Sequence, residues 1–321
     1  MALRPHPGPV LLVLPMAVIL DSNLQTDLRL AAVLDRALYE LLADSASIRT
    51  TGSVGYYGSI NGTGGATKRV RLAGLNGTDA MATQAAENTS VSNTSLTDAS
   101  SDIAVSRGSL RYDISDLASM TGFEGSDVDP MRLAASMVVA YERWWNSLLC
   151  SSITSFVTDA GSSGVDASVD DLFDAIAILE LANVQGPYTL LIHPRQLADL
   201  QSSIRGEAGA FQFMPATADM LAIKGQGYQG SILGVDVFRS SDVTSSGGNR
   251  HGAMWGAGAL GYADAVPPTP MSANSTTFAN TPILVEFSRT SEEATTLVVG
   301  HGYAGTGIIQ DSAGCGFVTD A

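Results

Sequence analysis

The sequence predicts an α+β fold for this chain of 321 residues. Three observations support that prediction. The predicted elements run in the order helix, hairpin, long helix, mixed helix and strand, and finally strands alone. That order lacks the regular βαβα alternation of a doubly wound fold. The composition, 45% hydrophobic and 15% charged, is that of a folded protein with weakly charged, strand-rich stretches.

Residues 1–50 are expected to form an N-terminal arm. An apolar run at 10–20 follows a single arginine and imitates a signal peptide. Four prolines interrupt this region, no small-x-small cleavage site precedes Asp21, and eleven residues are too few to span a bilayer. We therefore expect the arm to pack on something else, with a cleaved signal as the alternative. Leucines and alanines at helical spacing predict a helix at 22–44.

Residues 51–80 are expected to form an extended hairpin. The stretches "SVGYYGSI" and "TKRVRLAGL" have strand composition and flank the turn sequence "NGTGG". The chain from 78 to 113 is rich in Ser, Thr, Asn and Asp, and its short alternating stretches fit exposed β structure.

Two capped helices follow. Asp129 is the expected cap of the first, Pro130 takes its first position, and the apolar residues keep helical spacing to about 157. Charged side chains interrupt this helix, so it is not a membrane span. Ser168 and Asp171 form a capping-box pattern at the start of a second helix, which runs to about 183.

The remainder is predicted as mostly strands. A strand at 188–193 ends in His193, and Pro194 opens a helix that runs to 204. Gly-rich loops are expected at 205–230. Further strands are predicted at 231–243, 251–263, 282–290 and 295–309.

The sequence nominates no catalytic, cofactor or metal residue. "GAGALG", residues 256–261, matches G-x-G-x-x-G, but "YADAVPPTP" follows it and cannot continue as the helix that a dinucleotide site needs. The four histidines form no ligand-spaced pair and lie far along the chain from Cys150 and Cys315. Cys150 is expected to be buried in a helix, and Cys315 to lie in a turn or at a strand edge. His193 is interpreted as a strand-end residue rather than a general base.

The charge balance argues against a nucleic-acid-binding protein. Seventeen basic and 32 acidic residues give a formal charge of −15. Sequence-independent binding to nucleic acid requires clustered Lys and Arg, and the only dense basic cluster is "TKRVR" at 67–71.

In its order of segments, the chain resembles the major capsid protein of tailed bacteriophages, with the Hong Kong 97-like fold. The matching segments are the arm, the Gly-rich hairpin, the long capped helix, "YTLLIHPRQLADLQ", the strand pair "ILGVDVFRSSDV" and "HGAMWGAGALGYA", and the closing stretch from "ILVEFSRT". The resemblance implies an N-terminal arm at 1–50, an E-loop at 51–80, and a peripheral domain at 81–184 with a spine helix at 129–157. It further implies an axial domain at 185–275, and closing peripheral strands with a short polar C-terminal tail at 276–321.

The resemblance also implies a structural protein of the virion capsid that is not an enzyme and is assembled in the host cytoplasm. Subunits would form hexamers and pentamers of an icosahedral shell, contacting neighbouring capsomers, a portal, and scaffolding or decoration proteins. The shell would enclose double-stranded DNA without sequence-specific binding, and no membrane is involved. The exposed hairpin supplies the candidate inter-subunit contacts, which are Tyr56, Tyr57, Lys68, Arg69 and Arg71.

Other classes remain open at this point. An encapsulin-type nanocompartment shell would share the fold but enclose an enzyme cargo. A secreted adhesin would use the Thr- and Asn-rich stretches and would be favoured if the mature chain began after residue 20. A hydrolase would need a convergent polar cluster, and the sequence offers only isolated histidines.

Overall fold

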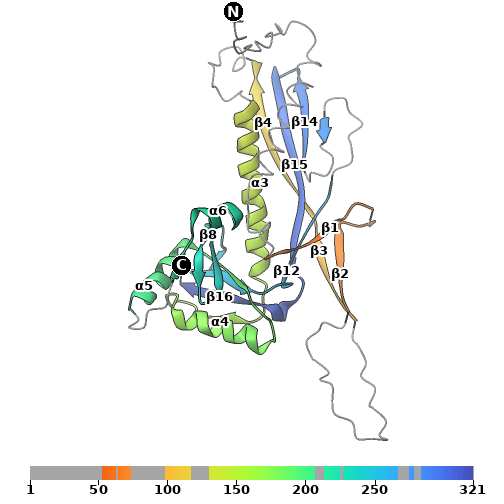
Figure 1. Cartoon of the computed structure of the whole chain (residues 1–321). Helices are drawn as coiled ribbons and strands as arrows, with labels where there is room; N and C mark the ends of the chain where they lie inside the picture. The colour runs from red at the N-terminus through yellow and green to blue at the C-terminus, as the bar shows by residue number, and fades with distance from the viewer. Residues whose placement is uncertain are drawn as a thin grey trace, which may run out of the picture.

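The computed structural model describes residues 53–62, 64–73, 98–116, 130–206, 213–224, 227–266, 275–277 and 283–320. The predicted N-terminal arm at 1–50 and its helix at 22–44 lie outside these residues. The described part has two lobes. A long helix and long strands form an elongated lobe, and a second sheet with shorter helices forms a rounder lobe at its base (Figure 1).

The elongated lobe pairs one helix with a six-stranded sheet. The helix is α3 (Pro130–Ile153), which confirms the long helix predicted to open at Pro130. It ends four residues earlier than predicted, because the chain turns after Ile153 and buries Phe156 in the core. The strand order is β1-β12-β15-β14-β13, with β4 also paired to β15. These strands are β1 (Gly55–Ser59), β4 (Ser106–Ser115), β12 (Leu260–Asp264), β13 (Ser275–Thr277), β14 (Ile283–Thr290) and β15 (Thr295–Ile308).

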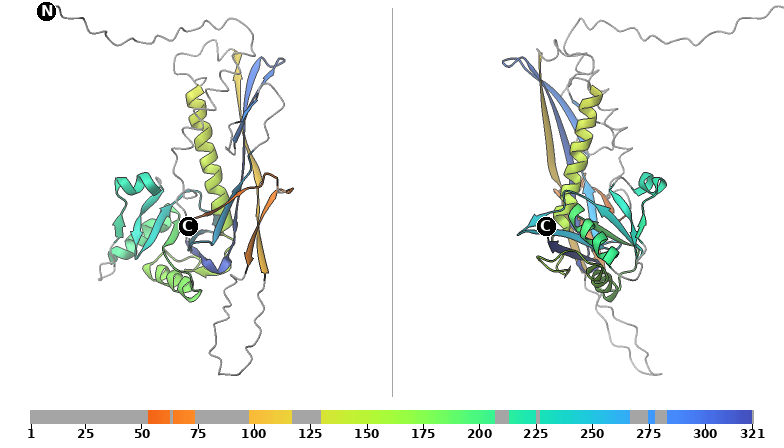
Figure 2. Two further views of the ribbon diagram at one scale, coloured as in Figure 1. Left: turned by 45° about the vertical axis from the view of Figure 1, so that its right-hand side comes forward. Right: turned by 90° about the vertical axis from the view of Figure 1, so that its left-hand side faces the viewer.

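Glycines let α3 lie close to the sheet. A Cβ added to Gly302 would come within 2.7 Å of the Tyr141 ring, and one added to Gly108 within 2.8 Å of the Trp144 ring. The two aromatic rings of α3 therefore rest on bare strand backbone, where any larger residue would collide with them. Figure 2 shows α3 running alongside the long strands in both views.

The rounder lobe is built on an eight-stranded sheet of order β5-β16-β11-β6-β9-β8-β7, with β10 paired to β11. Its central strand β6 is buried along its whole length. The elements are β5 (Asp159–Ala160), α4 (Val169–Leu181), β6 (Tyr188–Ile192), α5 (Pro194–Gly206), β7 (Phe213–Pro215), α6 (Ala218–Lys224), β8 (Tyr228–Ile232), β9 (Val235–Arg239), β10 (Ser245–Ser246), β11 (Asn249–Trp255), the short helix η2 (Asp311–Ala313) and β16 (Gly314–Asp320).

The predicted hairpin at 51–80 is wrong in its pairing, although both of its strands exist. β1 pairs in parallel with β12, and β2 (Thr67–Ala73) pairs antiparallel with β3 (Asp98–Ala104). The turn sequence "NGTGG" therefore links strands of two different sheets. Period-2 patterns identify strands, but they do not identify the partner that each strand bonds to.

Three other sequence predictions need correction. The single strand predicted at 251–263 is two strands, β11 and β12, which belong to different sheets. The loops predicted at 205–230 contain β7 and α6. The C-terminal segment, expected to be a polar tail, holds β16 between β11 and β5, and Cys315 is fully buried in that strand rather than at an edge. Small residues such as Gly314 and Gly316 obscure the strand pattern in the sequence.

The N-terminal caps of α4 and α5 are built differently. At α4 the predicted capping box is confirmed: the Ser168 hydroxyl accepts from Asp171 N at 3.2 Å, and Asp171 Oδ2 accepts from Ser168 N at 2.9 Å. At α5 the cap is His193. Its ring Nδ1 accepts from Arg195 N at 3.2 Å, and its own N–H donates to Gln196 Oε1 at 2.9 Å.

Gln196 extends this cap into the sheet. Its side chain is fully buried, and Nε2 donates to Phe317 O at 3.2 Å and to Thr319 Oγ1 at 2.8 Å. One amide thereby joins the start of α5 to β16, and satisfies polar groups that would be costly to bury unpaired. The start of α5 at 193–196 is therefore hydrogen-bonded both within itself and to the strand β16.

We predict that Gly302→Ala lowers the free energy of unfolding by about 1–3 kcal/mol, because its methyl group would collide with the Tyr141 ring. Urea denaturation of the purified protein measures this change. The control is Gly307→Ala on the same strand, where an added Cβ would meet atoms no closer than 3.6 Å. Equal effects of the two substitutions would contradict the packing argument.

We predict that His193→Ala costs about 1 kcal/mol of stability, and that His193→Asn, which keeps a cap acceptor, costs less. Burial, followed by the charge of Arg250, lowers the pKa of His193 below its usual 6.5. The stabilisation is therefore present above pH 6.5 and is lost as the pH falls through the lowered pKa, since a protonated ring cannot accept. Denaturation of wild type and variant from pH 4 to 8 should show the difference shrinking in acid. A constant difference would rule out the ring as the acceptor.

Candidate functional site

The β2–β3 ribbon carries three of the predicted contact residues. Its two strands form main-chain ladders only with each other among the described strands. One face packs on the body, where Val70 and Ile103 are buried with Ala263 and Ile309. Two-stranded ribbons are marginally stable alone, so the packed face holds this one in place and leaves the other face to solvent.

The basic residues of the ribbon divide between its faces. Arg69 and Arg71 are exposed, whereas Lys68 is half-buried on the packed face, with Nζ 3.5 Å from Ser59 O. Arg69 forms a two-bond ion pair with Asp102 across the ribbon, at 2.9 and 3.0 Å. The Arg69 guanidinium lowers the pKa of the Asp102 carboxyl. The structure thus brings Arg69 and Arg71 together on one exposed face and separates Lys68 from them.

The two tyrosines of β1 also differ. Tyr56 is 61% exposed, and its hydroxyl donates to Asp264 Oδ1 at 3.0 Å. Partial burial, then the charge of Asp264, raises the pKa of Tyr56 to about 12. Tyr57 is half-buried and packs against the cluster under the ribbon. Of the two, Tyr56 presents the larger free surface.

A polar cluster on the elongated lobe was missed in the sequence. His301 Nδ1 lies 2.9 Å from Ser109 Oγ, and its Nε2 lies 3.5 Å from Glu286 Oε2. The ring thereby links β4, β15 and β14 as a cross-strand contact. Its members are separated by up to 192 positions, and only the strand register, which pairs His301 with Ser109, brings them together.

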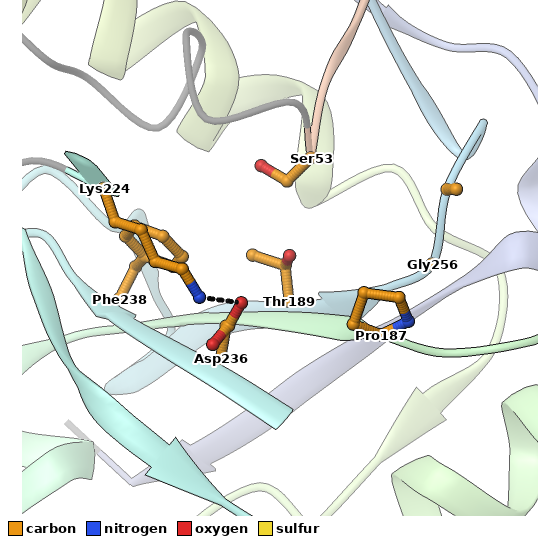
Figure 3. Close-up of a pocket in the computed structure, with 8 residues that line it drawn as sticks. Ser53, Pro187, Thr189, Lys224, Asp236, Phe238 and Gly256 are labelled. Carbon is orange, nitrogen blue, oxygen red and sulfur yellow. Dashed lines mark hydrogen bonds and ion pairs between the residues drawn. The ribbon is translucent and has the colours of Figure 1, made fainter. Parts of the chain in front are cut away.

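A small pocket of about 130 Å³ lies beside Thr189, Phe238 and Gly256 (Figure 3). Lys224 Nζ lies 2.6 Å from Asp236 Oδ2 in its wall, and the Tyr228 hydroxyl donates to Asp236 Oδ1 at 3.3 Å. The two charges neutralise each other within the protein. The pair fastens α6 to β9 rather than presenting a charge to a ligand.

The remaining candidates have structural roles. His193 is occupied in the α5 cap, and residues 256–259 form a turn that leads into a strand, β12, instead of a helix. Cys150 is buried in α3 as predicted, and burial raises the pKa of both Cys150 and Cys315 to about 12. Within the described ranges, no group of three or more His, Cys, Asp or Glu side chains could hold a metal ion. No helix in that part of the chain is long and apolar enough to cross a membrane.

Comparison with known proteins gives matches in structure but not in sequence. No family model and no curated protein matches the chain. Among solved structures, a chain of Mycobacterium phage Che8 is 14% identical with a TM-score of 0.57, over 85% of this chain and 92% of that one. The capsid of cyanophage P-SCSP1u is 13% identical with a TM-score of 0.55, over 86% and 88%.

An encapsulin shows the same degree of likeness. The holo-SrpI encapsulin complex from Synechococcus elongatus is 14% identical with a TM-score of 0.55, over 83% of this chain and 84% of that one. Each of these three matches extends over more than four-fifths of this chain. The chain therefore has the phage-capsid fold that its sequence resembles, the Hong Kong 97-like fold.

Proposed function

We propose that the chain is a major capsid protein whose copies form the hexamers and pentamers of an icosahedral shell around double-stranded DNA. The observation that carries this proposal is the likeness to capsid structures over more than four-fifths of the chain. Its role is structural rather than enzymatic, in agreement with the capping role of His193 and the cross-strand role of His301.

The exposed face of the β2–β3 ribbon supports assembly. A ribbon held to the body on one face only can lie over a neighbouring subunit, and shells repeat such heterologous contacts many times. The proposed contact surface comprises Tyr56, Arg69 and Arg71, with Tyr57 and Lys68 supporting it from the packed face. The formal charge of −15 suits a shell that encloses DNA without adhering to it.

The encapsulin-type nanocompartment is the second candidate, because the SrpI complex matches about as well as the capsids do. The two functions differ in cargo. A phage shell takes in DNA with the help of portal and scaffolding proteins in the host cytoplasm, whereas a nanocompartment encloses a protein. Purified particles that hold nucleic acid would favour the first function, and a stoichiometric co-purifying enzyme the second.

Expression of the full chain followed by negative-stain electron microscopy tests the proposal. We expect closed shells or free hexamers and pentamers. Sedimentation velocity on the same sample measures the assembled fraction. Uniform monomers that neither sediment as capsomers nor assemble when concentrated would overturn the shell function.

We predict that Arg71→Glu lowers the assembled fraction about tenfold or more, because reversing a charge at an interface places like charges together at a cost of several kcal/mol. The unassembled subunit should keep its stability to within about 0.5 kcal/mol, as is usual for an exposed site. Arg71→Lys, which keeps the charge, is the control and should assemble. Normal assembly of Arg71→Glu would remove this residue from the contact surface.

A further inference from the structure

An open apolar groove of about 450 Å³ lies where β1 ends, close to the base of the β2–β3 ribbon. Its size falls in the range of about 300–1,000 Å³ typical of ligand clefts. Most of its lining is apolar: Ile60, Ala66, Val105, Ala265, Val266 and Tyr303, together with Asn61, Ser106 and Arg107. Such a surface gains stability when another apolar group covers it.

One wall of the groove is held in place by Asn61. Its amide donates to Val266 O at 2.6 Å and accepts from Val266 N at 3.0 Å, so a side chain mimics a strand pairing. The bonds fasten residues 265–266, which follow β12, to the turn after β1. The groove is thus a formed feature of the fold rather than a gap between independent loops.

Among the described residues that line the groove, one side chain is charged, and it is a cation. Arg107 is exposed at its rim, and among the described residues no carboxylate forms an ion pair with it, whereas Arg69, Arg111 and Arg289 each pair with an aspartate. An occupant that fits this surface would be an uncharged apolar segment with one acidic residue at its end.

The chain contains one segment of that description outside the described residues. Residues 10–20, "VLLVLPMAVIL", form an uncharged apolar run, and Asp21 follows it directly. The prolines in and before this run favour an extended backbone, which suits a groove. The 32 residues from 22 to 53 could span roughly 100 Å if extended, which is enough to reach an adjacent subunit.

We propose that the apolar run 10–20 of a neighbouring copy docks in this groove, with Asp21 paired to Arg107. The inference rests on the proposed shell function, because the shell places a second copy within reach. It assigns the N-terminal segment a role in linking subunits.

Disulfide trapping between two different chains tests the docking. Ser106→Cys and Leu14→Cys are introduced into separate chains, which are co-expressed, assembled and oxidised. Since each chain carries one engineered cysteine and the native Cys150 and Cys315 are buried, a Ser106→Cys to Leu14→Cys bond can join only two copies. We expect covalent dimers, with the bond identified by peptide mass spectrometry. Ser162→Cys, exposed on the rounder lobe, replaces Ser106→Cys in the control and should give at least tenfold less dimer.

Charge reversal provides the second arm. Arg107→Glu in the Ser106→Cys chain should lower the dimer yield several-fold, and Asp21→Arg in the Leu14→Cys chain should restore it. Shells that form normally with no trapped dimer would overturn the docking and leave the shell function standing. Two double variants, Ser106→Cys with Leu14→Cys and Ser106→Cys with Met271→Cys, report on bonds within one chain. If either forms its bond within one chain in preference to the bond between copies, the docking is also overturned. If the wild-type chain forms no shells or capsomers, the proposed function itself fails.

Discussion

Close contact between α3 and the long strands is the constraint on which the rest of the elongated lobe depends. Tyr141 and Trp144 lie against strand backbone, and this is sterically allowed only because Gly108, Gly300 and Gly302 carry no side chain. At the end of the helix, the Thr306 hydroxyl donates to Leu148 O at 2.9 Å and lies 2.7 Å from Ser152 Oγ. Apolar packing along the helix and polar bonds at its end thus fix it to β15, and the contact of Trp144 with Gly108 also fixes it to β4.

β15 connects the packed helix to the other strands of the molecule. It is 14 residues long and pairs with β4 and β14 over one part and with β12 over another. β12 then continues from β11 of the second sheet, and Trp255 at the junction is fully buried and bonded to Ser53 O at 3.0 Å. The two lobes therefore share one hydrophobic core and are not independent units joined by a linker.

The buried framework leaves distinct surfaces of the molecule exposed. The body is held by buried contacts, while the ribbon, Tyr56 and the groove beside Arg107 present surfaces that the subunit itself does not cover. Lys224 and Asp236, in the wall of the small pocket, are paired with each other. The exposed residues of the proposed contact surface are therefore concentrated where β1, β2 and β12 meet.

The sequence by itself determined the local elements whose signals are short-range. Ser168 and Asp171 fixed the start of α4, Pro130 and the apolar spacing fixed α3, and the apolar "YTLLI" followed by Pro194 fixed the β6–α5 junction. It also pointed to the fold through the order of these elements. Caps, turns and helical periodicity depend on neighbours within a few positions, so one sequence is enough to read them.

Only the tertiary structure decided which strands pair and which side chains meet. It separated β1 from β2, placed β16 in the middle of a sheet, and brought His301 to Ser109 and Glu286. It also formed the groove between segments as distant as Ile60 and Tyr303. Strand pairing is decided by burial and register over long separations, and period-2 alternation carries no information about the partner.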